Sequence, residues 1–166
     1  MPIRHVEAHE AGRLRELRLA SLQADPGAFG ATFATDSARP DEWWERGARL
    51  SGEGREQRMF VVVDDQDRWL GMALVRPDDE SPGDAVLNAM WVAPEARGQG
   101  QARALCDACA VWARERGFAA LNTAVVAGNA AARRTYESAG FTFVGRSTWT
   151  GHGRTPDEEQ LRRPLR

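Results

Sequence analysis

The chain has 166 residues, of which 42% are hydrophobic and 28% are charged, a balance typical of one folded domain. Its 22 basic and 24 acidic residues leave a net charge of −2, so the basic surplus of a nucleic-acid binder is missing. No stretch approaches the roughly 20 apolar residues of a membrane span, and the N-terminus lacks the apolar core of a signal peptide. We therefore expect one domain over residues 1–166, a cytoplasmic location, and no nucleic-acid or membrane partner.

The N-terminal third of the chain predicts two helices. Leucines recur at helical spacing over residues 10–24, and the Asp-Pro-Gly sequence at 25–27 ends that helix. Residues 29–33 predict an apolar loop or short turn. A second short helix, which carries two tryptophans, begins at residues 39–41.

From residue 59 onward, β-branched and apolar runs alternate with helical patterns. The predicted strands are 59–63, 69–75, 85–92, 118–126, 141–145 and 159–165, and the predicted helices are 99–116 and 130–139. Gly117 and Gly140 follow the two helices as stop signals, and Asn129 is a favourable N-cap for the second one. The resulting order, α-α-β-β-β-α-β-α-β-β, predicts a mixed α/β chain without internal repeats.

Cys106 and Cys109 form a C-x-x-C sequence, which raises a redox or metal-binding hypothesis. A zinc site would need two more ligands, and none of the three histidines shows ligand spacing. The pair also lies inside the predicted helix 99–116, away from a helix start that would stabilise a thiolate. We expect two buried, small apolar residues and no metal.

A strand, a glycine-bearing turn and a helix start follow one another between residues 85 and 116, an arrangement that suits an anion. The first amides of a helix lack intrahelical acceptors, and the helix dipole favours a phosphate there. Gly98 and Gly100 allow close backbone approach, and Arg97 adds a fixed positive charge. The loop has no Gly-Lys-Ser/Thr, and Ala102 stands where a dinucleotide fingerprint has glycine. A tight turn without a ligand remains an alternative.

A second motif has the spacing N-x-x-A-x-x-x-Y-x-x-x-G-F and runs from Asn129 to Phe141. Its Tyr136, the only tyrosine of the chain, shares one helix face with Ala132. A phenol presented from a helix can donate a proton to a leaving group. The alternative is a core tyrosine whose ring packs and whose hydroxyl bonds a backbone group.

Residues 90–102 resemble motif A of the GNAT acetyltransferases, whose signature Q/R-x-x-G-x-G/A is filled by Arg97, Gly100 and Ala102. Residues 129–141 are similar to motif B, which in the family also lies some 30 residues further on. The resemblance covers residues 57–147 well. It implies the GNAT acyl-CoA N-acyltransferase fold, an α/β (α+β) class with a central mixed, mostly antiparallel sheet and helices on both faces.

The resemblance also implies roles for the matching residues. In the family, the backbone at the strand end bonds the pantetheine arm of acetyl-CoA, a role that falls here on Met90 and Val92. The loop amides hold the pyrophosphate, and these belong to Arg97, Gly98, Gln99, Gly100, Gln101 and Ala102. By the same resemblance Asn129 contacts the cofactor and Tyr136 protonates the departing thiolate. Gln101 departs from the family, which usually has an aliphatic residue there.

The resemblance implies that the protein is an acetyl-CoA-dependent N-acyltransferase. In the implied reaction, a primary amine of a small molecule or peptide attacks the thioester directly in a ternary complex. Bacterial GNAT proteins carry a sequence like residues 25–29, and family members are often dimers, so a homodimer is a further expectation. The alternative is a non-catalytic CoA-binding regulatory or interaction module. A third hypothesis, a nucleotide-phosphate binder, is disfavoured because the loop contains neither a lysine nor a Mg²⁺-binding hydroxyl.

The base that deprotonates the amine stays open. Many family members use a glutamate on the strand that corresponds to residues 85–92, where Asn88 is here the only polar residue. Candidates elsewhere are Asp36, Asp84, His152, Asp157 and Glu158, and a water chain to bulk solvent is an alternative. Four N-terminal aromatics either wall an acceptor cleft or pack in the core: Phe29, Phe33, Trp43 and Trp44.

Overall fold

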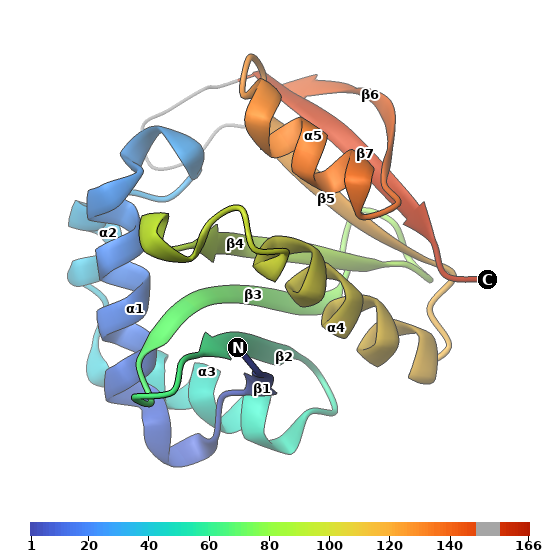
Figure 1. Cartoon of the computed structure of the whole chain (residues 1–166). Helices are drawn as coiled ribbons and strands as arrows, with labels where there is room; N and C mark the ends of the chain where they lie inside the picture. Colours follow the sequence, from blue (N-terminus) through green and yellow to red (C-terminus); the bar gives the residue numbers. More distant parts are fainter. Residues whose placement is uncertain (149–156) are drawn as a thin grey trace.

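A seven-stranded sheet forms the centre of the computed structural model, which describes residues 1–148 and 157–166 (Figure 1). Its strands are β1 (Ile3–His5), β2 (Arg58–Val63), β3 (Trp69–Pro77), β4 (Ala85–Val92), β5 (Ala120–Val126), β6 (Thr142–Thr148) and β7 (Asp157–Pro164). They lie in the order β1-β2-β3-β4-β5-β7-β6. Among them β4 and β5 are parallel, and every other neighbouring pair is antiparallel. The prediction of a mixed, mostly antiparallel sheet is confirmed.

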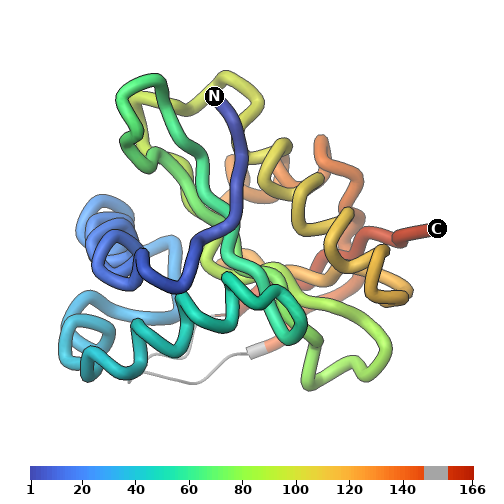
Figure 2. Tube along the Cα trace, turned by 90° about the horizontal axis from the view of Figure 1, so that it is seen from below, coloured from blue at the N-terminus to red at the C-terminus, as the bar shows by residue number. Residues whose placement is uncertain are grey.

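Helices cover both faces of this sheet, as predicted (Figure 2). The helices are α1 (Ala11–Ala24), α2 (Phe33–Ser37), α3 (Asp41–Glu53), α4 (Gln101–Glu115) and α5 (Ala130–Ser138), with short 3-10 turns η1 (Ala8–Glu10), η2 (Pro26–Ala28) and η3 (Pro94–Ala96). The first three helices pack together on one face, whereas α4 lies across β2, β3 and β4 on the other, next to α5. No helix in the described parts of the chain is both long and apolar enough to cross a membrane.

Two elements were not predicted, β1 and α2. Strand β1 has three residues, too few for a periodic pattern, and it is held by antiparallel pairing of Ile3 with Val62 of β2. Helix α2 replaces the end of the expected loop at residues 29–33. It begins after Thr32, whose hydroxyl oxygen accepts a 3.1 Å hydrogen bond from the amide of Thr35, a standard N-cap.

Helix α4 buries its apolar side against the sheet. Leu105, Cys106 and Cys109 are inaccessible to solvent, and the indole N–H of Trp112 donates to the carbonyl of Gly54 over 2.9 Å. Burial raises the pKa of the Cys106 thiol to about 12 and that of Cys109 well above its ordinary value. The two cysteines are therefore protonated, buried small residues, as predicted. Among the described residues no three His, Cys, Asp or Glu side chains are grouped to hold a metal ion.

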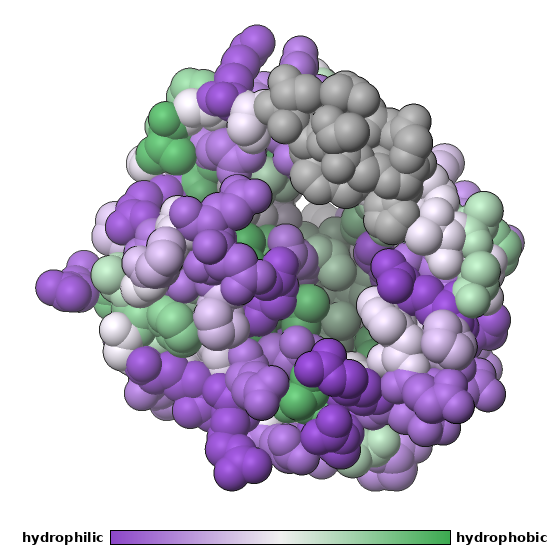
Figure 3. All heavy atoms as spheres, turned by 180° about the vertical axis from the view of Figure 1, so that it is seen from behind, coloured by the Kyte–Doolittle hydropathy of each residue, from purple (hydrophilic) through white to green (hydrophobic). Residues whose placement is uncertain are grey.

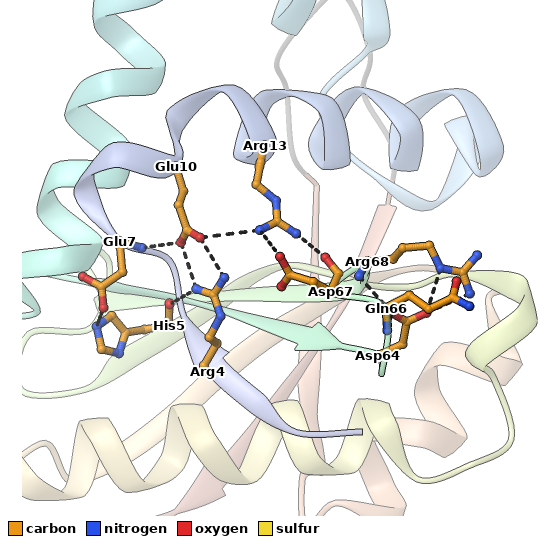
Figure 4. A network of polar contacts seen from close by, with 9 residues as sticks. All are labelled: Arg4, His5, Glu7, Glu10, Arg13, Asp64, Gln66, Asp67 and Arg68. Carbon is orange, nitrogen blue, oxygen red and sulfur yellow. Dashed lines mark hydrogen bonds and ion pairs between the residues drawn. The ribbon is translucent and has the colours of Figure 1, made fainter.

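A polar network fixes the N-terminal segment to the sheet (Figure 4). The buried carboxylate of Glu10 accepts two hydrogen bonds from Arg4 on β1, at 2.7 and 2.8 Å, and one from the amide of Glu7 at 2.9 Å. Arg13 on α1 lies 3.7 Å from the same carboxylate and 3.2 Å from that of Asp67, in the turn between β2 and β3. These contacts hold the start of α1 against the sheet, and α1 ends beside the candidate site.

Candidate active site

The site begins where β4 and β5 separate. The two strands pair only at their starts, where Ala85 and Val86 lie opposite residues 121–122. Beyond this point β4 stays paired with β3, while β5 pairs with β7 along its whole length. Backbone groups of β4 that face the opening therefore have no partner strand. They are available to an extended ligand.

A β-bulge bends β4 at this opening. Asn88 pairs with Leu74 and Trp91 pairs with Met72, so two residues of β4 lie opposite one residue of β3. The first of the two, Ala89, has a φ of 55°, a left-handed conformation that costs a non-glycine residue about 1 kcal/mol or more. Bulges re-aim the backbone and side chains next to functional sites, and Met90, the second residue of this one, lines two cavities.

The predicted phosphate loop faces open space at the start of α4. Gly98 and Gly100 have φ angles of 75° and 80°, and a Cβ added to either would meet no atom within 4 Å. Together with Arg97, Gln101 and Ala102 they line a cavity of about 290 Å³. Gln99 is exposed and outside this lining, with its Nε2 3.4 Å from the carbonyl of Glu95.

Arg97 binds two groups of the protein itself. Its Nε donates to the carbonyl of Val92 over 2.8 Å, and its Nη2 lies 2.7 Å from the carboxylate of Asp25, at the end of α1. The indole of Trp91 donates to the same oxygen of Asp25 over 2.8 Å. The hydrogen bond from Trp91 has the largest effect on the pKa of Asp25 and lowers it, and the hydrogen bond from Arg97 lowers it further. The charge of Arg97 is thus partly neutralised, an arrangement that the sequence does not indicate.

The second cavity, of about 320 Å³, lies between β4, β5 and α5 and unites the two sequence motifs. Met90, Val92 and Arg97 line it from one side, and Asn129 and Tyr136 from the other. The side-chain oxygen of Asn129 caps α5 by accepting a 3.2 Å hydrogen bond from the amide of Ala132, as predicted. Residues 90 and 136, far apart in the sequence, therefore face the same cavity.

Tyr136 is buried at the inner end of this cavity and packs edge-on against Phe141, with ring centroids 5.4 Å apart. Burial raises the pKa of its phenol, while a hydrogen bond with Thr123 acts in the opposite direction. The Thr123 hydroxyl also donates to the carbonyl of Leu87 on β4 over 3.1 Å. The phenol is protonated at neutral pH, as a proton donor requires.

A third cavity, of about 140 Å³, continues from Tyr136 along β4. Asn88, Ala89, Met90 and Thr123 line it, and the carboxyl group of Glu158 on β7 closes the lining. Burial, followed by the nearby charge of Glu80, raises the pKa of Glu158. Glu158 therefore shares this cavity with Tyr136, as Asp25 shares the second one.

The other candidate bases lie elsewhere or are engaged. Asp84 forms an ion pair with Arg162, and Asp36 lies 3.1 Å from both Arg18 and Arg39. Asp157 is exposed at the start of β7 and does not line the three cavities. His152 lies outside the described residues. Sequence reasoning placed Glu158 among these candidates, and the pairing of Glu158 with Val126 of β5 brings it to the opening.

Residues 17–141 of the chain match the model of the Acetyltransferase (GNAT) family. The chain belongs to the GNAT acetyltransferase family. Both motifs of the cavity wall lie inside the matched segment. A comparison with curated protein sequences finds no match for this GNAT chain.

Solved structures share the fold over nearly the whole length. A GNAT-family acetyltransferase from Streptococcus pneumoniae is 18% identical, with a TM-score of 0.79 and 98% of each chain covered. A phosphinothricin acetyltransferase from Sinorhizobium meliloti, solved with acetyl-CoA, is 21% identical with a TM-score of 0.75, covering 99% of this chain and 88% of that one. A putative acetyltransferase from Salmonella typhimurium, with its cofactor acetyl-CoA, is 21% identical with a TM-score of 0.74, covering 100% and 94%. These GNAT structures confirm the predicted fold.

Proposed function

We propose that this protein transfers an acetyl group from acetyl-CoA to a primary amine of a small molecule or peptide, by direct attack in a ternary complex. The observation that carries the proposal is the continuity of the cavities. The cavity beside the glycine loop shares Arg97 and Ala102 with the one between β4, β5 and α5. That cavity shares Met90 and Tyr136 with the one that Glu158 lines. Cavities so arranged would hold two substrates that meet at Tyr136.

The residues of this chain fit acetyl-CoA. The loop at Gly98 and Gly100 presents backbone to open space just before the first turn of α4, the arrangement that favours a pyrophosphate. The edge of β4 at Met90 and Val92, which has no partner strand, would offer backbone groups to the amide-bearing pantetheine arm, and the Val92 carbonyl there also accepts from Arg97. Asn129 lines the same cavity from the start of α5. Bound there, acetyl-CoA would supply the thioester whose acyl group is transferred.

The side chains around the third cavity supply the two proton transfers. We assign Glu158 as the group that accepts a proton from the incoming ammonium, since its raised pKa strengthens it as a base. The neutral amine then attacks the thioester carbon, a C–N bond forms and the C–S bond breaks. Tyr136, which is protonated, donates its proton to the departing sulfur, and the second proton that the nitrogen loses as the amide forms restores the phenol.

The non-catalytic alternative, a CoA-binding regulatory or interaction module, rests on the absence of an acidic residue from β4. Glu158 weakens this argument, because β7 presents a carboxyl group to the same opening. A module without turnover would also have no need of a protonated phenol between two cavities. We therefore favour the enzyme.

The test is an assay of purified protein with acetyl-CoA and a panel of amines, in which thiol release and acetylated product are both measured. The chain contains no lysine, so acetylation of its own lysines cannot contribute to the signal. Amine-dependent thiol release with matching product supports the enzyme. A rise of the melting temperature with acetyl-CoA, but no amine-dependent release, supports the non-catalytic module.

A further inference from the structure

A separate cavity of about 340 Å³ lies on the face of the sheet that carries α1, α2 and α3. Figure 3 views the molecule from the side opposite to Figure 1 and shows a central hollow with apolar side chains among hydrophilic ones. Leu14, Trp43, Trp44, Met59 and Leu74 give the cavity apolar walls. The two tryptophans lie edge to face, with centroids 4.7 Å apart. Of the two interpretations of these aromatics, a cleft wall is supported for Trp43, which is exposed, whereas Trp44 lines the cavity and also packs in the core.

The charged groups of this cavity are predominantly positive. Four arginines line it, Arg18, Arg39, Arg46 and Arg76, against one carboxylate, that of Asp36. The charge of Arg76 is compensated by the carboxylate of Asp79, which lies outside the cavity and 3.3 Å from the guanidinium. Arg46 forms no ion pair with any described residue. The lining therefore keeps a surplus of positive charge in a partly enclosed, apolar setting, where it attracts anions strongly.

Hydrogen-bond donors in this lining remain unused. Arg18 and Arg39 each direct Nε to Asp36, so the carboxylate engages one nitrogen of each guanidinium. Within the described part of the chain, the buried Nη1 of Arg18 and the buried indole nitrogen of Trp44 have no hydrogen-bond partner. A buried donor without an acceptor is unfavourable. An anionic oxygen that enters the cavity would balance the charge of its arginines.

This arginine cavity joins the site at the bulge of β4. Asn88 and Ala89 line both it and the small cavity that contains Tyr136 and Glu158. A molecule that extends past Ala89 would therefore place one end among the arginines and the other beside Tyr136. A polyamine would place a second ammonium among four guanidinium groups, which repel it.

We infer that the acceptor amine also carries a carboxylate, which binds in the arginine cavity while the amine reaches Tyr136. This inference rests on the proposed function and names its substrate class. Arg39 and Arg46 bind the carboxylate directly, and the tryptophans contact the apolar part of the molecule. The acceptor is thus an amino acid or a similar amino carboxylate.

Matched pairs of acceptors test the inference. The twenty L-amino acids and 4-aminobutyrate are compared with their carboxamides, which keep the amine and lose the charge, and with spermidine. Calorimetric titration of each compound into the protein in the presence of CoA measures acceptor binding without turnover. A failure of acetyl transfer can therefore be distinguished from a failure of the acceptor to bind. We expect at least one carboxylate to bind and react about tenfold or more better than its amide, as one charge-assisted hydrogen bond implies.

Two substitutions locate the effect. Arg39→Gln and Arg46→Gln should each raise the KM for the preferred carboxylate about tenfold and abolish its advantage over the amide. Arg49→Gln is the matched control, because Arg49 lies on α3 like Arg46, pairs with Glu53 at 3.3 Å and does not line the cavity. Melting curves show that the variants fold. The inference is overturned if carboxylates and amides are used equally, if spermidine is preferred, or if no panel member binds. It is also overturned if Arg49→Gln has the same effect as the two cavity substitutions.

Discussion

The Nη2 of Arg97 lies 2.7 Å from the Oδ2 of Asp25, and this ion pair joins the glycine loop to the end of α1. The two residues are 72 positions apart in the sequence and line the same cavity. The contact thereby links the segment proposed to hold the cofactor with the helix whose Arg18 lines the arginine cavity. A phosphate at the loop would compete with Asp25 for the guanidinium.

Asp25→Asn should therefore tighten acetyl-CoA binding about threefold at low salt and lose that gain at high salt, since the freed charge is half exposed and screened. The amide oxygen still accepts from Trp91. Because the pKa of Asp25 is lowered in the folded state, its stabilising contribution is present above the unfolded pKa and is lost as the pH falls through the folded one. The variant should thus melt lower than wild type at pH 7 and equally at low pH. Weaker acetyl-CoA binding in calorimetry would refute the competition.

Gly98→Ala and Gly100→Ala should each lower the affinity for acetyl-CoA about tenfold or more, because an added Cβ protrudes into the space that the loop faces. The positive φ angles alone cost about 1–2 kcal/mol of stability. Gly117→Ala is the matched control, since Gly117 has a φ of 83°, has open space around it and follows α4 at its far end. All three variants should melt lower, but only the two loop variants should lose the thermal shift with acetyl-CoA. An equal loss in Gly117→Ala would show that general strain is the cause.

Tyr136→Phe should leave acetyl-CoA affinity nearly unchanged and lower kcat about 10²-fold, the typical effect of losing a general acid. The ring and its contact with Phe141 are kept, so a large drop in stability is not expected. Acyl donors with more acidic thiols should restore part of the rate, because such thiolates leave without a proton. Steady-state kinetics with two donors measure this. Full turnover would make Tyr136 a core residue only.

Glu158→Gln should lower kcat/KM about 10²-fold and remove the acidic limb of its pH profile. The pKa of Glu158 is raised in the fold, so its ionisation favours the unfolded state. Its favourable contribution is complete below the ordinary value near 4.5 and is lost as the pH rises through the raised value. The variant should therefore melt higher than wild type at pH 8 and equally at pH 4.

Glu115→Gln, on an exposed position of α4, makes the same chemical change and should alter neither activity nor melting temperature. An unchanged pH profile in Glu158→Gln would assign the proton transfer to solvent.

Replacing Cys106 and Cys109 together with Ala should leave acetyl transfer intact and lower stability by about 1–2 kcal/mol, through the vacated volume. Both thiols are fully buried and protonated, so neither suits an acyl carrier or a redox group. Denaturant unfolding and steady-state assays of the one variant provide both numbers. Loss of activity in the folded variant would revive a covalent role for one of them.

The sequence by itself determined the parts of the site whose structure is local. Helix α4 follows from its apolar spacing, the conformation at Gly98 and Gly100 from the missing Cβ, and the start of α5 from the cap at Asn129. These features depend on a few consecutive residues, so composition and spacing predict them. The order of the elements and the family resemblance follow from the same pattern.

Tertiary structure alone decided how these pieces meet. The separation of β4 from β5, the placement of β7 between β5 and β6 and the bulge at Ala89 depend on pairings between distant segments. The same holds for side chains: Arg97 meets Asp25 across 72 positions of sequence, and Glu158 reaches the cavity of Tyr136 through pairing with β5. Charges at such separations come together only because burial of the apolar faces fixes the chain around them, and no local pattern records which of them become neighbours.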